Sequence, residues 1–480
     1  MNIKTHHPQY DATIEGWKIV TACCEGPRAV KELGTEILPP PDMRVSEHGA
    51  QYYDEARYKR YIQYANYLNV TGRTLAGLKG AATRNPPQIK LQPGIEHLEK
   101  NADGGGTTLA AMVGACIDGV IKRARHILVV DAAKDEGSLP YIKQYRAEAM
   151  INWRDEIVDG VTKMVMAVFE EKHKADDSKF SHRQVCKYRL FEINEAGVYQ
   201  QSLFSINDKG EEILEDGPFI PLDYNGNPFT ELPITTPGSV SNNSDIDPIP
   251  LEDIAWINIG HFRNSADLEE NNFYHGQLTL GVASSLSFDQ FKEANPNGIM
   301  VGARSGHFLG EGGQFTFVQA GANQLADKLM ERKERQMLMM GARLIEKGNP
   351  NTTATAASIE ATGENSALLT MVENIESVLN QCLGWCVKFG AAEEADSTIT
   401  MNREFFPENA DSQTLMAFIQ MYDRKIVAAS DVQALAKDSG ILSSSRSSED
   451  IKGEAGDPIY PLDKQTSNNQ APGAESNADI

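Results

Sequence analysis

A chain of 480 residues is long enough to bury a large core and to form roughly two to four structural units. Hydrophobic residues make up 41% and charged residues 23%, which is ordinary for a folded protein. The charge balance is less ordinary, because 67 acidic against 45 basic residues give a net charge of −22. Tight nonspecific DNA binding needs clustered lysine and arginine, so this composition argues against it. Two interpretations stay open: plain solubility, or a surface that comes near DNA without holding it.

The cysteines and the chain start indicate a protein made in a reducing compartment. None of the six cysteines forms a CxxC pair, and no Cys/His zinc spacing is present. Cys382 and Cys386 are one helical turn apart beside Trp385, which favours buried thiols. Residues 1–11 are polar and lack an apolar signal core, and stretches such as 127–130 are too short to span a bilayer. We therefore expect a soluble intracellular protein.

Residues before 250 predict helices first and an antiparallel meander afterwards. Helices are expected over residues 11–33, 50–68, 71–82, about 109–124 and 141–152. Strands are expected over residues 126–131, 164–169, 185–193 and 198–206. Residues 207–248 are rich in Pro, Gly, Asn and Asp and predict loop with short strand.

Two segments in this region have a functional and a structural interpretation. Six tyrosines over residues 52–67 could stack on bases, but their helical spacing favours amphipathic packing. A glycine-rich segment at 103–108 precedes a helix and could hold phosphate. It lacks the lysine and hydroxyl pair of a P-loop, so an Asp/Thr helix cap is the stronger interpretation.

The segment from Leu251 to Lys347 predicts a helix, a small β-rich insert and a second helix. Apolar residues from Leu251 to Ala266 recur at three- and four-residue spacing and share one helix face. Short alternating runs follow at 277–280, 299–301 and 315–318, with a glycine turn at 310–313. Helical spacing resumes over 322–346, and we expect Leu325, Leu329, Leu338 and Leu344 on one side. A helix pair with a β module at its tip buries little alone, which suggests that copies pack side by side.

The C-terminal part predicts one long helix, a short helical region and a tail. Residues 348–353 interrupt the preceding helix, and an amphipathic helix is expected over 354–389. Further helices are expected within 411–442. Residues 443–480 hold three basic and seven acidic residues with few large apolar ones, which is typical of a disordered tail.

The sequence contains no recognisable catalytic motif. HExxH, GxSxG, Walker A and paired-aspartate metal motifs are missing. A Cys–His nucleophile remains an alternative, because such partners need only meet in space. We expect no enzyme activity, no cofactor and no metal.

Several segments, taken in order, resemble the portal (head-to-tail connector) proteins of tailed bacteriophages. The matching segments are Tyr64–Thr74, Gly77–Gly80, Asp103–Gly104, Ile127–Asp131, Tyr141–Ile142, Ile151–Trp153, Pro250–Asn258, His261–Glu269, Gln336–Met337, Gly341–Leu344 and Thr353–Ala356. Each is weakly specific, and their shared order is strongly specific. The chain departs from the family at Gln277, where proline is common, and at Arg84, which follows a threonine.

The resemblance implies an α+β portal-type fold with an α/β wing, a two-helix stem, a small β-rich clip and a short helical crown. The expected regions are the wing at 1–249, stem helices at 250–275 and 322–347, the clip at 276–321, a tunnel loop at 348–355, a long wing helix with a return strand at 356–405, the crown at 406–442 and the tail at 443–480.

The resemblance also implies a function and partners. A dodecameric ring at one capsid vertex of the virion would be assembled in the bacterial cytoplasm and would let double-stranded DNA pass. The ring would bind the terminase large subunit during packaging and the head-tail adaptor afterwards. It would also contact the major capsid protein, and no membrane interaction is expected. A phage hydrolase with a Cys/His site and a non-channel capsid component are the alternatives.

Three groups of residues are expected to serve that function. The tunnel loop would place Lys347, Asn349, Asn351, Thr352 and Thr353 near DNA. The clip docking surface would include Asp289, Lys292, Glu293, Arg304 and Glu311. The stem would carry Arg263, Glu269, Lys328, Arg332 and Arg335. An acidic bore would repel the duplex over about 8 Å at physiological salt, which suits a conduit that must not grip phosphates.

Overall fold

The computed structural model describes residues 2–46, 50–132, 139–175, 180, 182–207, 209–276, 279–296, 298–299, 307–318, 324–343, 367–390, 396–403 and 405. The chain divides into two units, Met1–Arg403 and Glu404–Ile480, and every element described below belongs to the first. The crown and tail regions and the tunnel loop lie outside the described residues. The first unit is α+β, as the sequence indicated.

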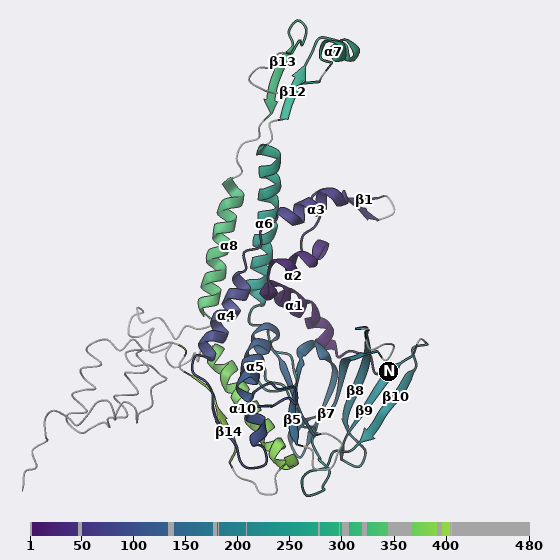
Figure 1. Cartoon of the computed structure of the whole chain (residues 1–480), viewed down its shortest axis with the longest axis vertical. Coiled ribbons are helices and arrows are strands. Elements are labelled where there is room, and N and C mark those ends of the chain that lie inside the picture. The colour runs from purple at the N-terminus through teal and green to yellow at the C-terminus, as the bar shows by residue number, and fades with distance from the viewer. Residues whose placement is uncertain are drawn as a thin grey trace, which may run out of the picture. The chain divides into compact units, whose positions relative to one another are not determined.

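Helices dominate the first 123 residues (Figure 1). They are α1 (Pro8–Glu25), α2 (Pro27–Glu32), η1 (Gly34–Glu36), α3 (Glu55–Tyr64), α4 (Val70–Ala82), η2 (Glu96–Glu99) and α5 (Leu109–Arg123). Gly26 splits the first predicted helix, because its φ of +100° cannot continue an α-helix and Pro27 restarts one. The helix predicted over 50–68 is shorter, since the Asp54 side chain caps it by accepting the N–H groups of Ala56 and Arg57.

Helix α1 is anchored at the centre of these helices by Trp17. The Trp17 side chain is fully buried, and its indole Nε1 donates to the Arg123 carbonyl at 2.8 Å. This bond satisfies the one polar atom of the ring and ties α1 to the end of α5. The glycine-rich segment before α5 acts as a cap, because Thr108 accepts from Ala111 and Asp103 accepts from Gly105 and Thr107.

A three-stranded antiparallel sheet of order β11-β4-β5 follows α5. Its strands are β4 (His126–Ala132), β5 (Pro140–Arg146) and β11 (Ile234–Thr235). Helix α10 (Ala367–Gly390) packs on α5, β4 and β5 with a face that includes Leu368, Val372 and Leu379 (Figure 1). The chain then returns through β14 (Thr398–Thr400), which pairs with β3 (Gln88–Lys90). A separate short pair joins β1 (Arg44–Val45) to β2 (Gln51–Tyr52).

The predicted meander is confirmed and has one further strand at each edge. The five strands are β6 (Met150–Val158), β7 (Val161–Lys174), β8 (Gln184–Ile193), β9 (Tyr199–Ile206) and β10 (Glu212–Phe219), in the order β10-β9-β8-β7-β6. All neighbours in this sheet are antiparallel. Strand β10 lies in the segment where the sequence predicted loop with short strand. The strand itself was not located, because almost every residue in it is exposed and no alternation marks it.

The helix predicted over 141–152 is wrong. The segment holds β5, the 3-10 turn η3 (Ala147–Ala149) and the start of β6. All seven residues of β5 pair with β4, from Pro140 with Ala132 to Arg146 with His126. Pairing between strands separated in the chain outweighs the local helix preference, and window-based sequence reasoning does not register it.

The segment from residue 252 to 343 contains the helix, insert and helix that the sequence predicted. Its elements are α6 (Glu252–Gly276), β12 (Thr279–Ala283), α7 (Phe288–Ala294), β13 (Gln314–Val318) and α8 (Gln324–Arg343). Helix α7 was not predicted. The strand predicted at 299–301 falls largely outside the described residues. No helix within the described residues is long and apolar enough for a bilayer span.

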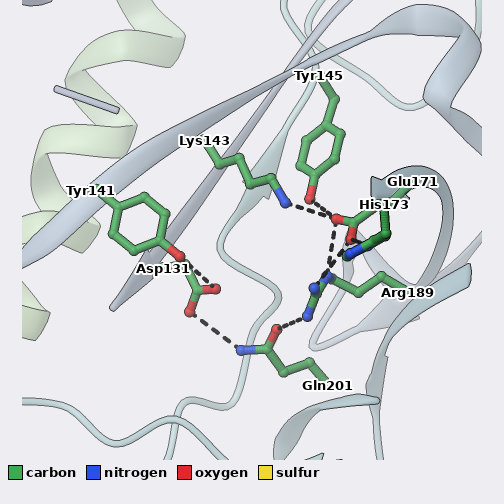
Figure 2. A network of polar contacts seen from close by, with 8 residues as sticks. All are labelled: Asp131, Tyr141, Lys143, Tyr145, Glu171, His173, Arg189 and Gln201. Atoms are coloured by element: carbon green, nitrogen blue, oxygen red, sulfur yellow. Dashed lines mark hydrogen bonds and ion pairs between the residues drawn. The ribbon is translucent and has the colours of Figure 1, made fainter. Parts of the chain in front are cut away.

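A polar network connects the two sheets at Glu171 (Figure 2). The Glu171 carboxylate on β7 accepts from Lys143 Nζ at 2.8 Å, from Arg189 Nε at 3.0 Å and from Arg189 Nη2 at 3.1 Å. It also bonds the Tyr145 hydroxyl and lies 2.9 Å from His173 Nε2. Lys143 and Tyr145 belong to the three-stranded sheet and Arg189 to the five-stranded one, so a single carboxylate joins both.

The pKa of Glu171 shows that this carboxylate stays ionised. Burial alone would raise the pKa, but hydrogen bonds and charge from Arg189 and then Lys143 hold it well below its ordinary value of 4.5. The network continues from Arg189 through Gln201 to Asp131, which also lies 3.4 Å from the Tyr141 hydroxyl (Figure 2).

We predict that Glu171→Gln destabilises the first unit by about 3 kcal/mol at neutral pH, because two cations lose their common partner. The depressed pKa means that this stabilisation is present above about pH 4.5 and is lost as pH falls. Urea unfolding at several pH values should therefore show a gap between wild type and variant that narrows in acid.

Glu156→Gln is the matched control. Glu156 pairs with Arg154 in the same sheet, but their side chains are 53% and 65% exposed, so the change should cost less than about 0.5 kcal/mol. Equal effects of the two substitutions would contradict the assigned role of Glu171.

Candidate functional site: the helix pair and its tip

Helix α6 is seated on the N-terminal helices by a buried amide. Asn258 is fully buried within the apolar face of α6. Its Oδ1 accepts from Thr71 Oγ1 at 2.9 Å and from the Thr71 N–H at 3.3 Å, while Nδ2 donates to the Leu68 carbonyl at 2.9 Å. The Tyr67 hydroxyl lies 2.9 Å from Asn258 Oδ1 and from the Cys23 carbonyl. The amide thus fixes the start of α4 to one position along α6.

Farther along α6, polar contacts attach α3 and the segment that follows it. They are Arg57 Nε to Glu270 Oε1 at 2.9 Å, Tyr61 hydroxyl to Asp267 Oδ1 at 2.6 Å, and Asn66 Nδ2 to Glu269 Oε1 at 3.0 Å. One turn before Asp267 and on the same face of α6, Arg263 Nε donates to the Ile37 carbonyl. Helix α6 is therefore held along much of its length rather than at its base alone.

Helix α8 runs alongside α6 (Figure 1), and side chains of Lys333 and Glu334 join the two helices. Lys333 Nζ donates to the Gly260 carbonyl at 2.8 Å and to Asn264 Oδ1 at 3.0 Å. The next residue of α6, His261, places its Nε2 at 3.1 Å from Glu334 Oε1. A Cβ on Gly260 would come within 3.1 Å of Lys333 Nζ, so glycine lets the lysine reach the backbone. Met337 is fully buried beside these contacts.

The tip, meaning the described residues between α6 and α8 (279–296, 298–299 and 307–318), contains paired strands and a capped helix. Strands β12 and β13 pair antiparallel from Thr279 with Val318 to Ala283 with Gln314. Helix α7 begins with a capping box between Ser287 and Gln290. Asn295 Nδ2 then lies 2.9 Å from the Phe308 carbonyl, and the Gly313 N–H donates to the Gly310 carbonyl at 3.2 Å, which confirms the predicted glycine turn.

The structure separates the predicted site residues into three groups. Asp289, Lys292 and Glu293 are exposed on α7, and Glu311 is exposed in the glycine turn. Lys328, Arg332 and Arg335 are exposed on α8, whereas Arg263 and Glu269 bind the N-terminal region. Arg304, Lys347, Asn349, Asn351, Thr352 and Thr353 lie outside the described residues.

The leucines predicted to share one side of α8 are exposed wherever the structure describes their side chains. Leu325, Leu329 and Leu338 are 65%, 38% and 66% exposed, and Leu344 lies outside the described residues. The face turned to α6 carries Ala326 and Met337 instead. On a helical wheel Leu338 also falls on a different side from Leu329, because nine positions amount to two and a half turns.

Sequence reasoning missed the contacts that hold the helix pair together. Asn258 interrupts an apolar helix face, and a buried amide at such a position signals a specific partner. Lys333 and Glu334 gave no such signal, because charged residues on a helix are usually solvated.

The thiols of the chain are not activated nucleophiles. All six cysteines are free. Burial raises the pKa of Cys23 to about 11 and the pKa of Cys24 and Cys116 to about 12. Burial also raises the pKa of Cys186, Cys382 and Cys386. Protonated thiols at neutral pH count against a thiolate nucleophile. Across the described part of the chain, His, Cys, Asp and Glu form no cluster suited to a metal ion.

Comparison with protein families yields one match within this region. Residues 250–390 match a family described as a domain of unknown function, DUF4055. No curated protein matches the chain.

Several solved structures share parts of the architecture at low identity. One is from the virion of a native gene transfer agent particle, with 12% identity, 82% of this chain and 95% of that chain covered, and a TM-score of 0.41. A second is the neck of the native particle, computed with C12 symmetry. It has 13% identity, 76% of this chain and 89% of that chain covered, and a TM-score of 0.40. A third is an HK97-family phage portal protein from Corynebacterium diphtheriae. It has 10% identity, 73% of this chain and 94% of that chain covered, and a TM-score of 0.30. The last of these structures belongs to the class that the sequence resemblance indicated, but likenesses at these scores decide no function.

We predict that Asn258→Ala destabilises the first unit by about 2 kcal/mol, because it leaves the buried Thr71 hydroxyl and Leu68 carbonyl without their partner. Chemical denaturation measures this change. Asn272→Ala, on an exposed position of the same helix, is the control and should change stability by less than about 0.5 kcal/mol. A neutral Asn258→Ala would show that the amide does not seat α6.

Proposed function

We propose that copies of this chain form a closed ring, a phage portal of twelve subunits, through which double-stranded DNA enters and leaves the capsid. In this proposal α6 and α8 form the stem, the segment from 276 to 321 forms the clip, and the two sheets with α1–α5 and α10 form the wing. The sequence resemblance to portal proteins supports the same assignment.

One observation carries the proposal: α8 exposes large apolar side chains along a helix that packs within its own chain mainly on α6 and α4. Leu338 and Met339 are 66% and 60% exposed. Burying such side chains is worth about 1.5–3 kcal/mol each, and neighbouring copies placed side by side could cover them. A ring uses this surface without leaving an unpaired end.

The charge of the chain suits a conduit. A net charge of −22 disfavours a grip on phosphates, so a duplex could slide past without breaking many ion pairs. In the proposal, the tunnel loop with Lys347, Asn349, Asn351, Thr352 and Thr353 touches DNA only weakly.

The tip supplies a docking surface in this proposal. Phe288 and Phe308 are 80% and 64% exposed on an ordered module that also displays Asp289, Lys292 and Glu293. Exposed aromatic side chains on a firm support are typical binding anchors. We assign this surface to the terminase large subunit during packaging and afterwards to the head-tail adaptor, and the wing to the major capsid protein.

We predict that the purified chain assembles into an annular oligomer with a central opening. Native mass spectrometry gives the mass, and negative-stain class averages show the opening. A monomer or dimer that turns over a substrate would favour the hydrolase alternative, and a large oligomer without an opening would favour a non-channel capsid component.

We also predict that deleting residues 347–353 leaves the ring intact but impairs DNA packaging or retention, because the weak contact with the duplex is lost. Packaged DNA per capsid, measured by nuclease protection, is the readout. Exchanging the exposed pair Arg28 and Glu32 on α2 is the control and should have no effect. Normal packaging by the deletion variant would refute the tunnel-loop assignment.

A further inference from the structure

Helix α8 carries two parallel stripes of opposite charge. The acidic stripe consists of Asp327, Glu331 and Glu334, and the basic stripe consists of Lys328, Arg332 and Arg335. Both stripes have the same spacing, four residues and then three, so each follows one line along the helix. The basic stripe is shifted by one position, which is about 1.5 Å along the axis and about 100° around it.

The two stripes end in matching apolar residues. Leu338 continues the acidic stripe four residues after Glu334, and Met339 continues the basic stripe four residues after Arg335. Both side chains are more than half exposed. The stripes therefore share a pattern of three charges followed by one large apolar side chain.

Both stripes are accessible in the single chain. Asp327, Lys328 and Arg332 are exposed, and the side chains of Glu331 and Arg335 are 66% and 79% exposed. Glu331 and Arg335 lie 3.8 Å apart within the helix, an exposed pair that contributes little and can exchange partners. Glu334 contacts His261, yet its side chain remains 42% exposed.

We infer that the acidic stripe of one copy's α8 packs against the basic stripe of α8 in the next copy; this rests on the ring proposed above. In a ring, all copies of α8 point the same way, so two stripes with the same spacing stay in register over all three charges. Leu338 of one copy then meets Met339 of the next. In a two-fold dimer the two helices would run antiparallel. The four-residue step of one stripe would then lie opposite the three-residue step of the other, and the charges would not all stay in register.

The contact uses two different patches of one surface, which is the head-to-tail type that generates closed rings. Opposite charges at this interface set the register and disfavour wrong neighbours, while the apolar pair supplies burial. The interface should consequently weaken as salt rises.

Charge reversal tests the pairing. The first variant carries Asp327→Lys and Glu331→Lys, and the second carries Lys328→Glu and Arg332→Glu. Each alone should form at least tenfold fewer rings than wild type at about 0.1 M salt, because like charges then face each other. A 1:1 mixture of the two should restore rings in which they alternate, and a chain with all four changes should assemble by itself. Native mass spectrometry distinguishes the two masses in the mixed ring.

Matched controls carry the same change of net charge elsewhere. Glu32→Lys with Glu99→Lys matches the first variant, and Arg28→Glu with Lys100→Glu matches the second; all four positions lie outside α8 and are exposed. These controls should form rings normally. Circular dichroism and thermal unfolding of each variant separate a failure to assemble from a failure to fold.

The outcomes separate the two proposals. Rings formed by wild type and by either stripe variant alone would overturn the stripe pairing and leave the ring proposal standing. Folded stripe variants that fail alone and also fail when mixed would likewise overturn the pairing. Absence of any ring from wild type would overturn both.

Discussion

The helix pair of α6 and α8 depends on how α6 is held, and the buried Asn258 amide is the central contact. Within an apolar interface an amide stabilises only one arrangement, because any shift leaves donors and acceptors unpaired. Asn258 meets the Leu68 carbonyl and the Thr71 N–H and hydroxyl, so α4 can take one axial position on α6. The direction in which α6 leaves the N-terminal helices follows from this choice, and α8 and the tip follow from α6.

Charges serve different purposes in different parts of the chain. In the two sheets, cations from β5 and β8 converge on Glu171 and are largely consumed within the fold (Figure 2). Along α8, Lys333 and Glu334 attach the helix to α6, while Arg332 and Arg335 point to solvent. The overall surplus of acidic residues is compatible with a surface that does not bind DNA tightly. The alternating acidic and basic residues on α8 are compatible with a second surface that binds another copy of the chain.

Within the described residues, several ionisable groups with shifted pKa values lie inside the fold. The Glu171 carboxylate has several donors, and burial raises the pKa of thiols such as Cys23 and Cys116, which therefore stay protonated at neutral pH. What the chain exposes instead are large side chains on ordered supports, such as Phe288 on a capped helix and Leu338 on α8. Such surfaces bind other proteins more readily than they transform small molecules.

The sequence by itself determined the order of the elements wherever a strong periodicity ran along one segment. The apolar repeat of α6, the alternation from β7 to β9 and the cap of α5 are local signals, and each element formed where its signal lay. Tertiary structure alone decided the identity of β5 and β10, because these strands exist through pairing with β4 and β9 rather than through their own pattern. It also decided which side of α8 faces α6. Leucines attract attention in a sequence, but the clamp of Lys333 on Gly260 and the burial of Met337 fixed the rotation of that helix and left the leucines outside.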